Sequence, residues 1–127
     1  MANETILTED AFLVSETDSK GNIIFVNDEF CKVAGYSREE LLGNPHNIVR
    51  HKDMPKAAFK DLWETVKSGS VWEGYVKNAT KDGGFYWVFA TIYPYNNSND
   101  EQCYMSCRRK PSRDDITQVE ALYKKMS

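Results

Sequence analysis

The chain has 127 residues, of which 41% are hydrophobic and 28% charged, so it is long enough for one globular domain with a single core. Its formal net charge of -3 excludes a general nucleic-acid binder, which needs a basic face. Three cysteines without a CxxC spacing exclude a disulfide framework and a zinc motif, and no apolar run has the length of a membrane span. We therefore expect a cytoplasmic protein, or a cytoplasmic fragment of a longer one, that does not insert into the membrane.

The first residues predict a short cap followed by a β-hairpin. Residues 3–10 hold Asn and Thr side chains suited to helix capping, so we expect a short helical cap there. Residues 11–16 and 23–26 are apolar strand segments, and the turn sequence DSKGN lies between them. This order is typical of a hairpin.

Helices are predicted next. Asn27 is a suitable N-cap for a helix that ends at Gly35, and Ser37 with Glu40 forms a capping box for a second short helix. A polar loop over residues 44–53 follows and holds both histidines. The longest helix then begins at Met54-Pro55, and its apolar stripe consists of Ala58, Phe59, Leu62, Trp63 and Val66.

The second half of the chain is predicted to be β-structure. Strands are expected over residues 71–80, 85–95 and 102–110, joined by hairpin turns. Residues 112–127 form an amphipathic helix. Two strands, a helical region and three further strands indicate an α+β domain with one antiparallel sheet.

Two segments carry a resemblance to a known family. Residues 18–43, DSKGNIIFVNDEFCKVAGYSREELLG, resemble the first half of a PAS domain, with a hairpin, N-x-x-F and G-Y-S-x-E-E-L-x-G. Residues 82–88, DGGFYWV, are similar to the late PAS strands. The resemblance implies the PAS fold, a five-stranded antiparallel sheet with helices on one face. It predicts an N-terminal cap over residues 1–10, a sensor domain over 11–110, and a flanking linker or signalling helix over 111–127.

The polar loop narrows the resemblance to one subgroup. The segment RHKDMP is similar to the PAS domains of aerotaxis and redox-taxis receptors, which carry FAD. In that subgroup an Arg-His-x-Asp-Met-Pro segment is implicated in flavin binding, and it matches Arg50, His51 and Asp53 here. Lys52 stands where the subgroup usually has proline. The basic pair that usually follows the pocket asparagine is also replaced, by Ala79-Thr80.

The implied cofactor lies between the sheet and the helices, so strand alternation assigns the facing side chains. The family pattern places Asn78 inward, where its amide both donates and accepts hydrogen bonds. Trp72 has the same parity on that strand. On the next strand the inward candidates are Tyr86, Val88 and Ala90, and the small last two leave room for a flat ring.

The remaining candidates lie in the loop and the long helix. Arg50 suits a cofactor phosphate, with a salt bridge to Asp53 or Glu64 as the alternative. His51 suits a cofactor contact or a loop-structuring role, and Asp53 suits a helix cap more than a ligand contact. Further cofactor-binding candidates are Trp63, Trp72, His46 and Asn47. For the two tryptophans, packing in the core is the alternative.

The outward set of the long strand is apolar and should not stay bare. It consists of Phe85, Trp87, Phe89, Thr91 and Tyr93. We expect it to be covered by the N-terminal cap or by a second subunit, which would make the protein a homodimer. The amphipathic C-terminal helix is expected to act as an exit linker or a dimer element.

The resemblance implies a sensor that binds FAD and signals redox, oxygen or energy state to a chemotaxis-type transducer or downstream domain. A haem sensor, with His46 or His51 as axial ligand, and a cofactor-free docking module are the alternatives. An enzyme is not expected. His51 and Asp53 are an acid–base pair in principle, but no nucleophile elbow, metal motif or phosphate loop accompanies them.

Overall fold

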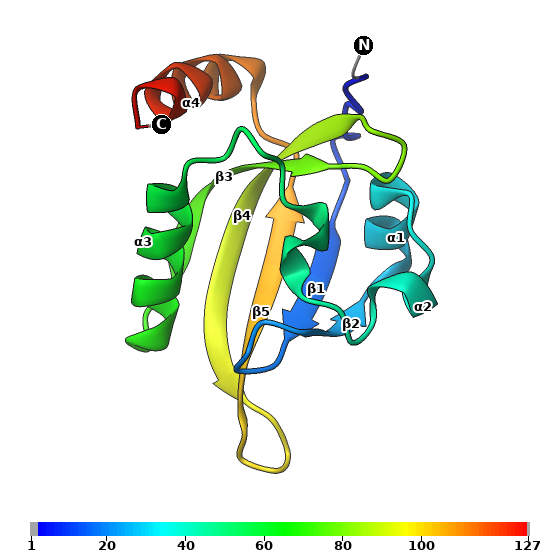
Figure 1. Ribbon diagram of the computed structural model, residues 1–127, viewed down its shortest axis with the longest axis vertical. Helices are drawn as coiled ribbons and strands as arrows, with labels where there is room; N and C mark the ends of the chain where they lie inside the picture. Colours follow the sequence, from blue (N-terminus) through cyan, green and yellow to red (C-terminus); the bar gives the residue numbers. More distant parts are fainter. Residues whose placement is uncertain (1–2, 127) are drawn as a thin grey trace.

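One antiparallel sheet of five strands carries the fold, in the order β2-β1-β5-β4-β3 (Figure 1). The computed structural model describes residues 3–126, so residues 1, 2 and 127 of the predicted cap and C-terminal helix lie outside the described residues. The strands are β1 (Leu13–Thr17), β2 (Ile23–Val26), β3 (Trp72–Ala79), β4 (Phe85–Asn96) and β5 (Gln102–Arg109). The predicted PAS architecture is confirmed.

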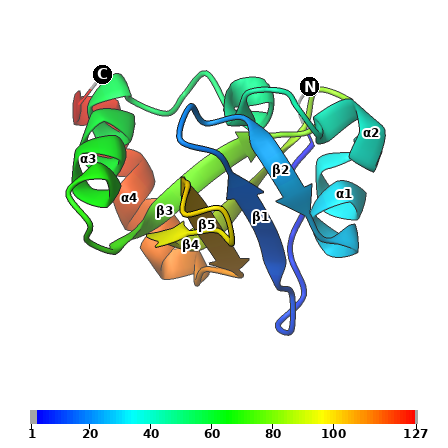
Figure 2. The ribbon, with the colours of Figure 1, turned by 90° about the horizontal axis from the view of Figure 1, so that it is seen from below.

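Helices lie on both faces of this sheet. The helices are α1 (Asp28–Ala34), α2 (Arg38–Leu41), the 3₁₀ helix η1 (His46–Val49), α3 (Lys56–Lys67) and α4 (Arg113–Met126). Figure 2 shows that α4 is on the opposite face of the sheet from η1. Among the described residues, no helix combines the length and apolarity needed to cross a membrane.

The predicted helix caps of the first half are confirmed. The Asn27 carboxamide accepts a hydrogen bond from the Phe30 amide at 3.0 Å, and its Nδ2 donates to the Phe12 carbonyl at 2.8 Å. Its Oδ1 also accepts from the Val14 amide at 3.1 Å, so one side chain both starts α1 and ties it to β1. Ser37 and Glu40 form the capping box of α2, with both reciprocal hydrogen bonds present.

The N-terminal segment is extended, so the prediction of a helical cap is wrong. The Thr5 amide donates to the Phe85 carbonyl at 2.8 Å, and the Phe85 amide donates to the Asn3 carbonyl at 3.0 Å. Leu7 is buried beyond this bridge. An eight-residue isolated helix has too few hydrogen bonds to offset its nucleation cost. Pairing with the start of β4 satisfies the same backbone groups at once.

The two faces of the sheet follow the predicted alternation. Asn78 pairs with Tyr86 and Val76 with Val88 across β3 and β4, so these residues share the inner face. The inner face and the helices enclose a core in which Phe30, Leu41, Val49, Val66, Tyr86 and Val88 are fully buried.

The outer face is covered mainly by α4. The ring of Tyr123 stacks on Trp87, with centroids 6.3 Å apart, and its hydroxyl donates to the Tyr75 carbonyl at 2.6 Å. The Tyr75 hydroxyl donates to Asp115 at 2.8 Å, and Ile116 is buried. The predicted flanking C-terminal helix is present. The outer face was expected to be covered by the N-terminal cap or by a second subunit, but α4 of the same chain packs on it, because its apolar side matches the aromatic outer face.

Candidate functional site

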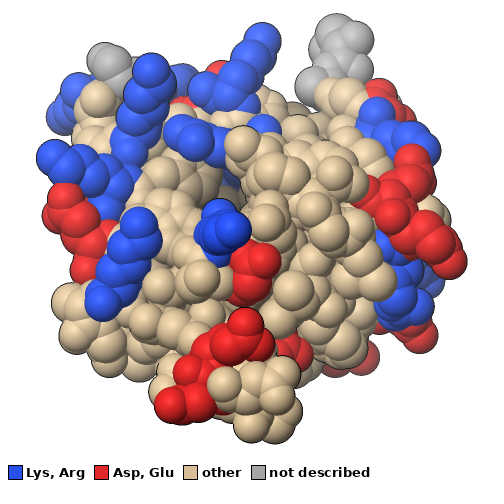
Figure 3. All heavy atoms as spheres, turned by 60° about the horizontal axis from the view of Figure 1, so that its bottom comes forward, with Lys and Arg blue, Asp and Glu red and all other residues tan. Residues whose placement is uncertain are grey.

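A cavity of about 390 Å³ opens between the inner face of the sheet and the helices η1 and α3. This volume lies within the range of small-molecule sites. The molecule is hollowed on this side, with Lys and Arg side chains around the hollow (Figure 3). Sheet residues that line the cavity include Thr17, Val76, Asn78, Ala90, Ile92, Tyr104, Ser106 and Arg108. The helical side and the loops contribute Lys20, His46, Asn47, Arg50, Phe59, Leu62, Trp63 and Lys67.

The charged side chains of this cavity are all basic. Lys20, Arg50, Lys67 and Arg108 line it, and no Asp or Glu of the described chain does. Clefts lined by charges of one sign concentrate ligands of the opposite sign. The cavity is therefore suited to an anionic ligand.

Arg50 is held at the mouth by its backbone and by a ring contact. It forms an isolated antiparallel bridge with Asn78, and its guanidinium carbon lies 3.9 Å from the centroid of Phe59. The alternative ion pairs to Asp53 or Glu64 are not formed, and no carboxylate within residues 3–126 pairs with Arg50. Its charge is available to a ligand.

Asn78 and Tyr86 bring unpaired polar atoms to the inner face. Asn78 Nδ2 and the Tyr86 hydroxyl are buried on paired residues of β3 and β4, and neither makes a hydrogen bond of good geometry within the described residues, although Asn78 is close enough to act on the pKa of Tyr86. Burial raises the pKa of Tyr86, so its hydroxyl stays protonated. A buried unpaired polar group costs about 1–3 kcal/mol, which a ligand that pairs with it removes.

His46 and Arg108 form the polar floor of the cavity. Arg108 Nη2 lies 3.0 Å from His46 Nε2, and the Ser15 hydroxyl lies 3.0 Å from the same nitrogen. A guanidinium can only donate, so His46 Nε2 accepts and the imidazole is neutral. Burial and the charge of Arg108 lower the pKa of His46 to about 3.

His51 and Asp53 are not among the residues that line the cavity. The Asp53 amide donates to His51 Nδ1 at 3.0 Å, and the His51 ring packs edge-on against Phe85. Asp53 Oδ2 lies 2.9 Å from Lys77 Nζ. The expectation that Asp53 caps the long helix is wrong, since the N-cap of α3 is Pro55 without a side-chain cap. Lys77 takes the carboxylate instead.

The two tryptophans have different positions. Trp63 lines the cavity and packs edge-on against Tyr104 at 5.3 Å between centroids. Trp72 is buried, donates from Nε1 to Asp61 at 2.9 Å, and covers Gly74 so closely that an added Cβ there would lie 2.5 Å from its ring. Trp72, Tyr86 and Val88 belong to the core around the cavity, whereas Ala90 lies in its wall.

Several lining residues were not predicted, and Arg108 is the most informative of them. A signal was present, because residues 102–110 were a predicted strand and alternation puts Tyr104, Ser106 and Arg108 on one face. The register pairs Arg108 with the inward Ala90. A positive charge on the inner face of a central strand is rare without a function.

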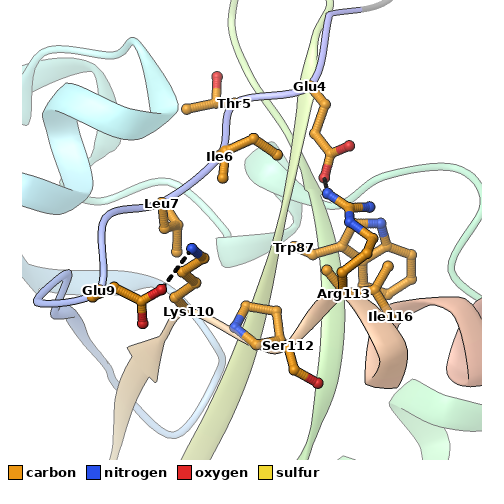
Figure 4. Close-up of a pocket in the computed structure, with 11 residues that line it drawn as sticks. Glu4, Thr5, Ile6, Leu7, Glu9, Trp87, Lys110, Ser112, Arg113 and Ile116 are labelled. Carbon is orange, nitrogen blue, oxygen red and sulfur yellow. Dashed lines mark hydrogen bonds and ion pairs between the residues drawn. The ribbon is translucent and has the colours of Figure 1, made fainter.

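A second cavity, of about 490 Å³, lies on the outer face between the N-terminal segment and the start of α4 (Figure 4). Its cations are neutralised locally, since Arg113 pairs with Glu4 and Lys110 pairs with Glu9, each at 2.9 Å. These pairs tie the N-terminal segment to α4 and to the end of β5. The inner cavity, with its unpaired cations, is the better candidate for a ligand site.

A single sheet with helices enclosing a ligand-sized cavity is an architecture suited to a small binding domain. A family model described as the PAS fold matches residues 23–109, and the chain belongs to this family. A structure of the blue-light photoreceptor Aureochrome1 LOV in its light state has the same fold, with a TM-score of 0.73 at 17% identity over 89% of this chain and 91% of that one.

Curated relatives are receptors and regulators. The aerotaxis receptor of Escherichia coli (strain K12) is 46% identical over 97% of this chain, and the nitrogen fixation regulatory protein of Klebsiella oxytoca is 30% identical over 83% of it. The matched regions are 24% and 21% of those two proteins. The chain therefore spans less than a quarter of the length of these relatives.

Proposed function

We propose that this chain is a cytoplasmic PAS sensor module that binds FAD and signals redox, oxygen or energy state through protein contacts. The observation that carries the proposal is the composition of the inner cavity. Buried polar atoms without a hydrogen-bond partner lie around the cavity. The charged side chains that line it are all cations. A flavin dinucleotide combines a flat ring that has a polar edge with two phosphates, and both features match.

Each part of such a ligand has residues suited to it. At the mouth, Arg50, Lys20 and Lys67 are suited to the phosphates. Inside, Asn78 Nδ2 and Arg108 Nη1 are donors without a partner among the described residues. When bound, flavin supplies reversible redox chemistry in which the ring nitrogen N5 gains a proton and becomes a hydrogen-bond donor.

Asn78 is suited to respond to this change, because its carboxamide presents either an acceptor or a donor after a rotation. Its main chain is bridged to Arg50 and paired with Tyr86. The next residue on β4 is Trp87, which contacts α4 through Tyr123. A change at Tyr86 on the inner face therefore lies one residue along β4 from the Trp87 contact that holds α4, and we propose that the bound ligand changes how firmly α4 is held.

The partner is proposed from the relatives. The match to an aerotaxis receptor favours a chemotaxis-type transducer, or a domain downstream of α4, as the receiver of the signal. The N-terminal segment and the solvent-facing side of α4, which itself covers the outer face of the sheet, are the proposed surface for a homodimer. Apolar side chains are exposed there at Ile6, Leu122 and Met126.

Haem fits the described geometry less well than flavin does. His46 Nε2 already accepts from Arg108, and His51 is absent from the cavity lining. An axial ligand needs a free imidazole nitrogen directed at the iron.

The test is the absorbance spectrum of the purified protein, oxidised and then reduced with dithionite, followed by chromatography of the molecule released on denaturation. The expected result is a two-banded flavin spectrum that bleaches on reduction, with FAD as the released molecule. A Soret band would favour the haem alternative. A colourless protein that takes up no added FAD would favour the docking module and contradict the proposal.

A further inference from the structure

We propose that Arg108 contacts the buried end of the ligand and selects its negatively charged form, so that reduced flavin is held as the anion. The inference rests on the proposed function and assigns a role within the same site. It starts from an unusual arrangement: a guanidinium that is only 4% exposed and has no carboxylate partner within the described residues.

The position of Arg108 is fixed by the sheet and by His46. Its backbone pairs with Leu13 on β1 and Ala90 on β4, so it lies on a central strand. Nη2 contacts His46 Nε2, and the guanidinium carbon lies 5.2 Å from the centroid of Phe30. Nη1 has no partner among the described residues, although it is buried. One edge of the guanidinium is thus held by protein, and another is left for a ligand.

The contacts that Arg108 does make leave its charge uncompensated. A neutral imidazole and an aromatic face stabilise a cation far less than a carboxylate does. Burial of a charge without a counter-charge is costly, and here burial lowers the pKa of Arg108 to about 10, so it remains charged at neutral pH. A ligand that brings negative charge to this place removes the cost.

The two titratable side chains that face Arg108 from other elements, His46 and Tyr86, are neutral near pH 7. The titratable groups facing Arg108 are His46 from η1, Tyr86 from β4 and Cys107 on its own strand. Burial and Arg108 lower the pKa of His46 to about 3, and burial raises the pKa of Tyr86, so both are neutral. The cations at the mouth are Lys20, Arg50 and Lys67. The electrostatic potential at the floor of the cavity is therefore positive over the whole pH range near neutrality.

The number of protons taken up on reduction shows whether the reduced flavin is bound as the anion or as the neutral form. Two electrons from dithionite and one proton from water, which forms the N5–H bond, convert oxidised flavin into the reduced anion. A second proton, taken up at N1, gives the neutral form. A neighbouring fixed cation favours the anion and lowers the pKa for the second protonation.

The experiment measures the midpoint potential of the FAD-loaded protein from about pH 5 to about pH 8 by dye equilibration. We expect the wild type to take up one proton per two electrons down to the acid end of this range. Arg108→Gln should take up two protons there, which doubles the slope of potential against pH. The variant should also bind reduced FAD at least about tenfold more weakly than the wild type, with a smaller change for oxidised FAD.

Arg109→Gln is the matched control, because it removes the same charge from the next residue. Arg109 is exposed, and its guanidinium lies 4.7 Å from the Phe12 centroid, away from the cavity lining. Its slope should equal that of the wild type. Arg108→Lys, which keeps the charge, should retain the one-proton slope and serves if the Gln variant does not fold.

The wild-type slope alone can overturn the role of Arg108, even if no variant folds. FAD binding with a two-proton slope at the acid end would overturn the role of Arg108 and leave the proposed function standing. If the wild type and a folded Arg108→Gln variant had equal slopes of midpoint potential against pH, the role of Arg108 would also be overturned, and the proposed function would still stand. A wild type that binds no FAD would overturn both proposals.

Discussion

Lys77 Nζ lies 2.9 Å from Asp53 Oδ2, and this ion pair attaches the loop before α3 to strand β3. Lys77 is a buried residue on the outer parity of the strand, and its amide also donates to Met54 Sδ at 3.3 Å. One residue further along β3, Asn78 bridges to the backbone of Arg50. His51 and Asp53 therefore place Arg50 and α3 against the sheet, without lining the cavity themselves.

Replacement of Asp53 by Asn should lower the free energy of unfolding of the ligand-free domain by about 1 kcal/mol. Asp53 is more than half exposed, so solvent screens the pair, but Lys77 is left buried without its partner. Urea unfolding followed by circular dichroism measures the change. Glu64→Gln, which removes the exposed partner of Lys60, is the control and should fall within error. If Asp53→Asn lost no more free energy of unfolding than Glu64→Gln, the ion pair between Asp53 and Lys77 would not be what attaches the loop to β3.

The same pair predicts a pH dependence. Lys77 lowers the pKa of Asp53, so the contribution of the pair is present above the ordinary aspartate value and is lost as pH falls through the lowered one. The stability difference between the wild type and Asp53→Asn should therefore narrow below about pH 4. A difference that stays constant from neutral to acid pH would assign the effect to packing.

His46 predicts a second and distinct acid sensitivity. Its pKa is lowered from 6.5 to about 3 in the folded chain, so the unfolded chain binds the proton more readily between these values. The ligand-free domain should lose up to about 1.4 kcal/mol per pH unit as pH falls below 6.5. His46→Gln should flatten this part of the stability curve. An unchanged slope in a folded variant would show that other groups take up the protons.

Tyr86→Phe should separate stability from binding. It removes a buried hydroxyl that has no partner among the described residues, so the ligand-free domain should be as stable as the wild type or more stable by up to about 1 kcal/mol. FAD binding should weaken, because Tyr86 is the cross-strand neighbour of Asn78, whose carboxamide is proposed to bind the ligand, and loss of the hydroxyl changes the polar surroundings of that carboxamide. Thermal melts with and without FAD measure both effects. A destabilised apo form would show that the hydroxyl has a partner in the protein.

Tyr75→Phe should loosen α4 without disturbing the cavity. The lost hydroxyl donates to Asp115, and the residue lies on the outer face. Hydrogen exchange should rise in residues 113–126, while the affinity for FAD remains that of the wild type. Faster exchange confined to the inner strands would contradict this placement of the contact.

Much of the fold was predictable, because its signals are local. Asn27 and Ser37 cap their helices through atoms three residues away. The family pattern placed Asn78 on the inner face, and strand alternation then placed Ala90 there. The errors involve partners distant in the sequence. Phe85 organises the N-terminal segment from eighty residues further along the chain, and Lys77 takes the carboxylate expected to cap α3. Neither partner has a sequence pattern of its own.

The site was predictable in part for the same reason. Arg50, Trp63, Asn78 and Ala90 were candidates and line the cavity. Arg108 was missed because its place depends on the register between β4 and β5, which pairs it with Ala90. Alternation restricts a residue to a face, but only register brings it opposite a particular neighbour.

The basic lining of the inner cavity also has a kinetic consequence. Four cations without an acidic neighbour in the described lining attract any polyanion over a distance of about 8 Å at physiological ionic strength. Cofactor association should therefore slow as salt is added, while dissociation, which depends on contacts already made, changes little. Free nucleotides carry phosphates too, and the same field draws them in. We expect the unpaired donors inside the cavity, Asn78 Nδ2 and Arg108 Nη1, to retain a flavin ring. A free nucleotide that meets only the cations at the mouth should dissociate faster.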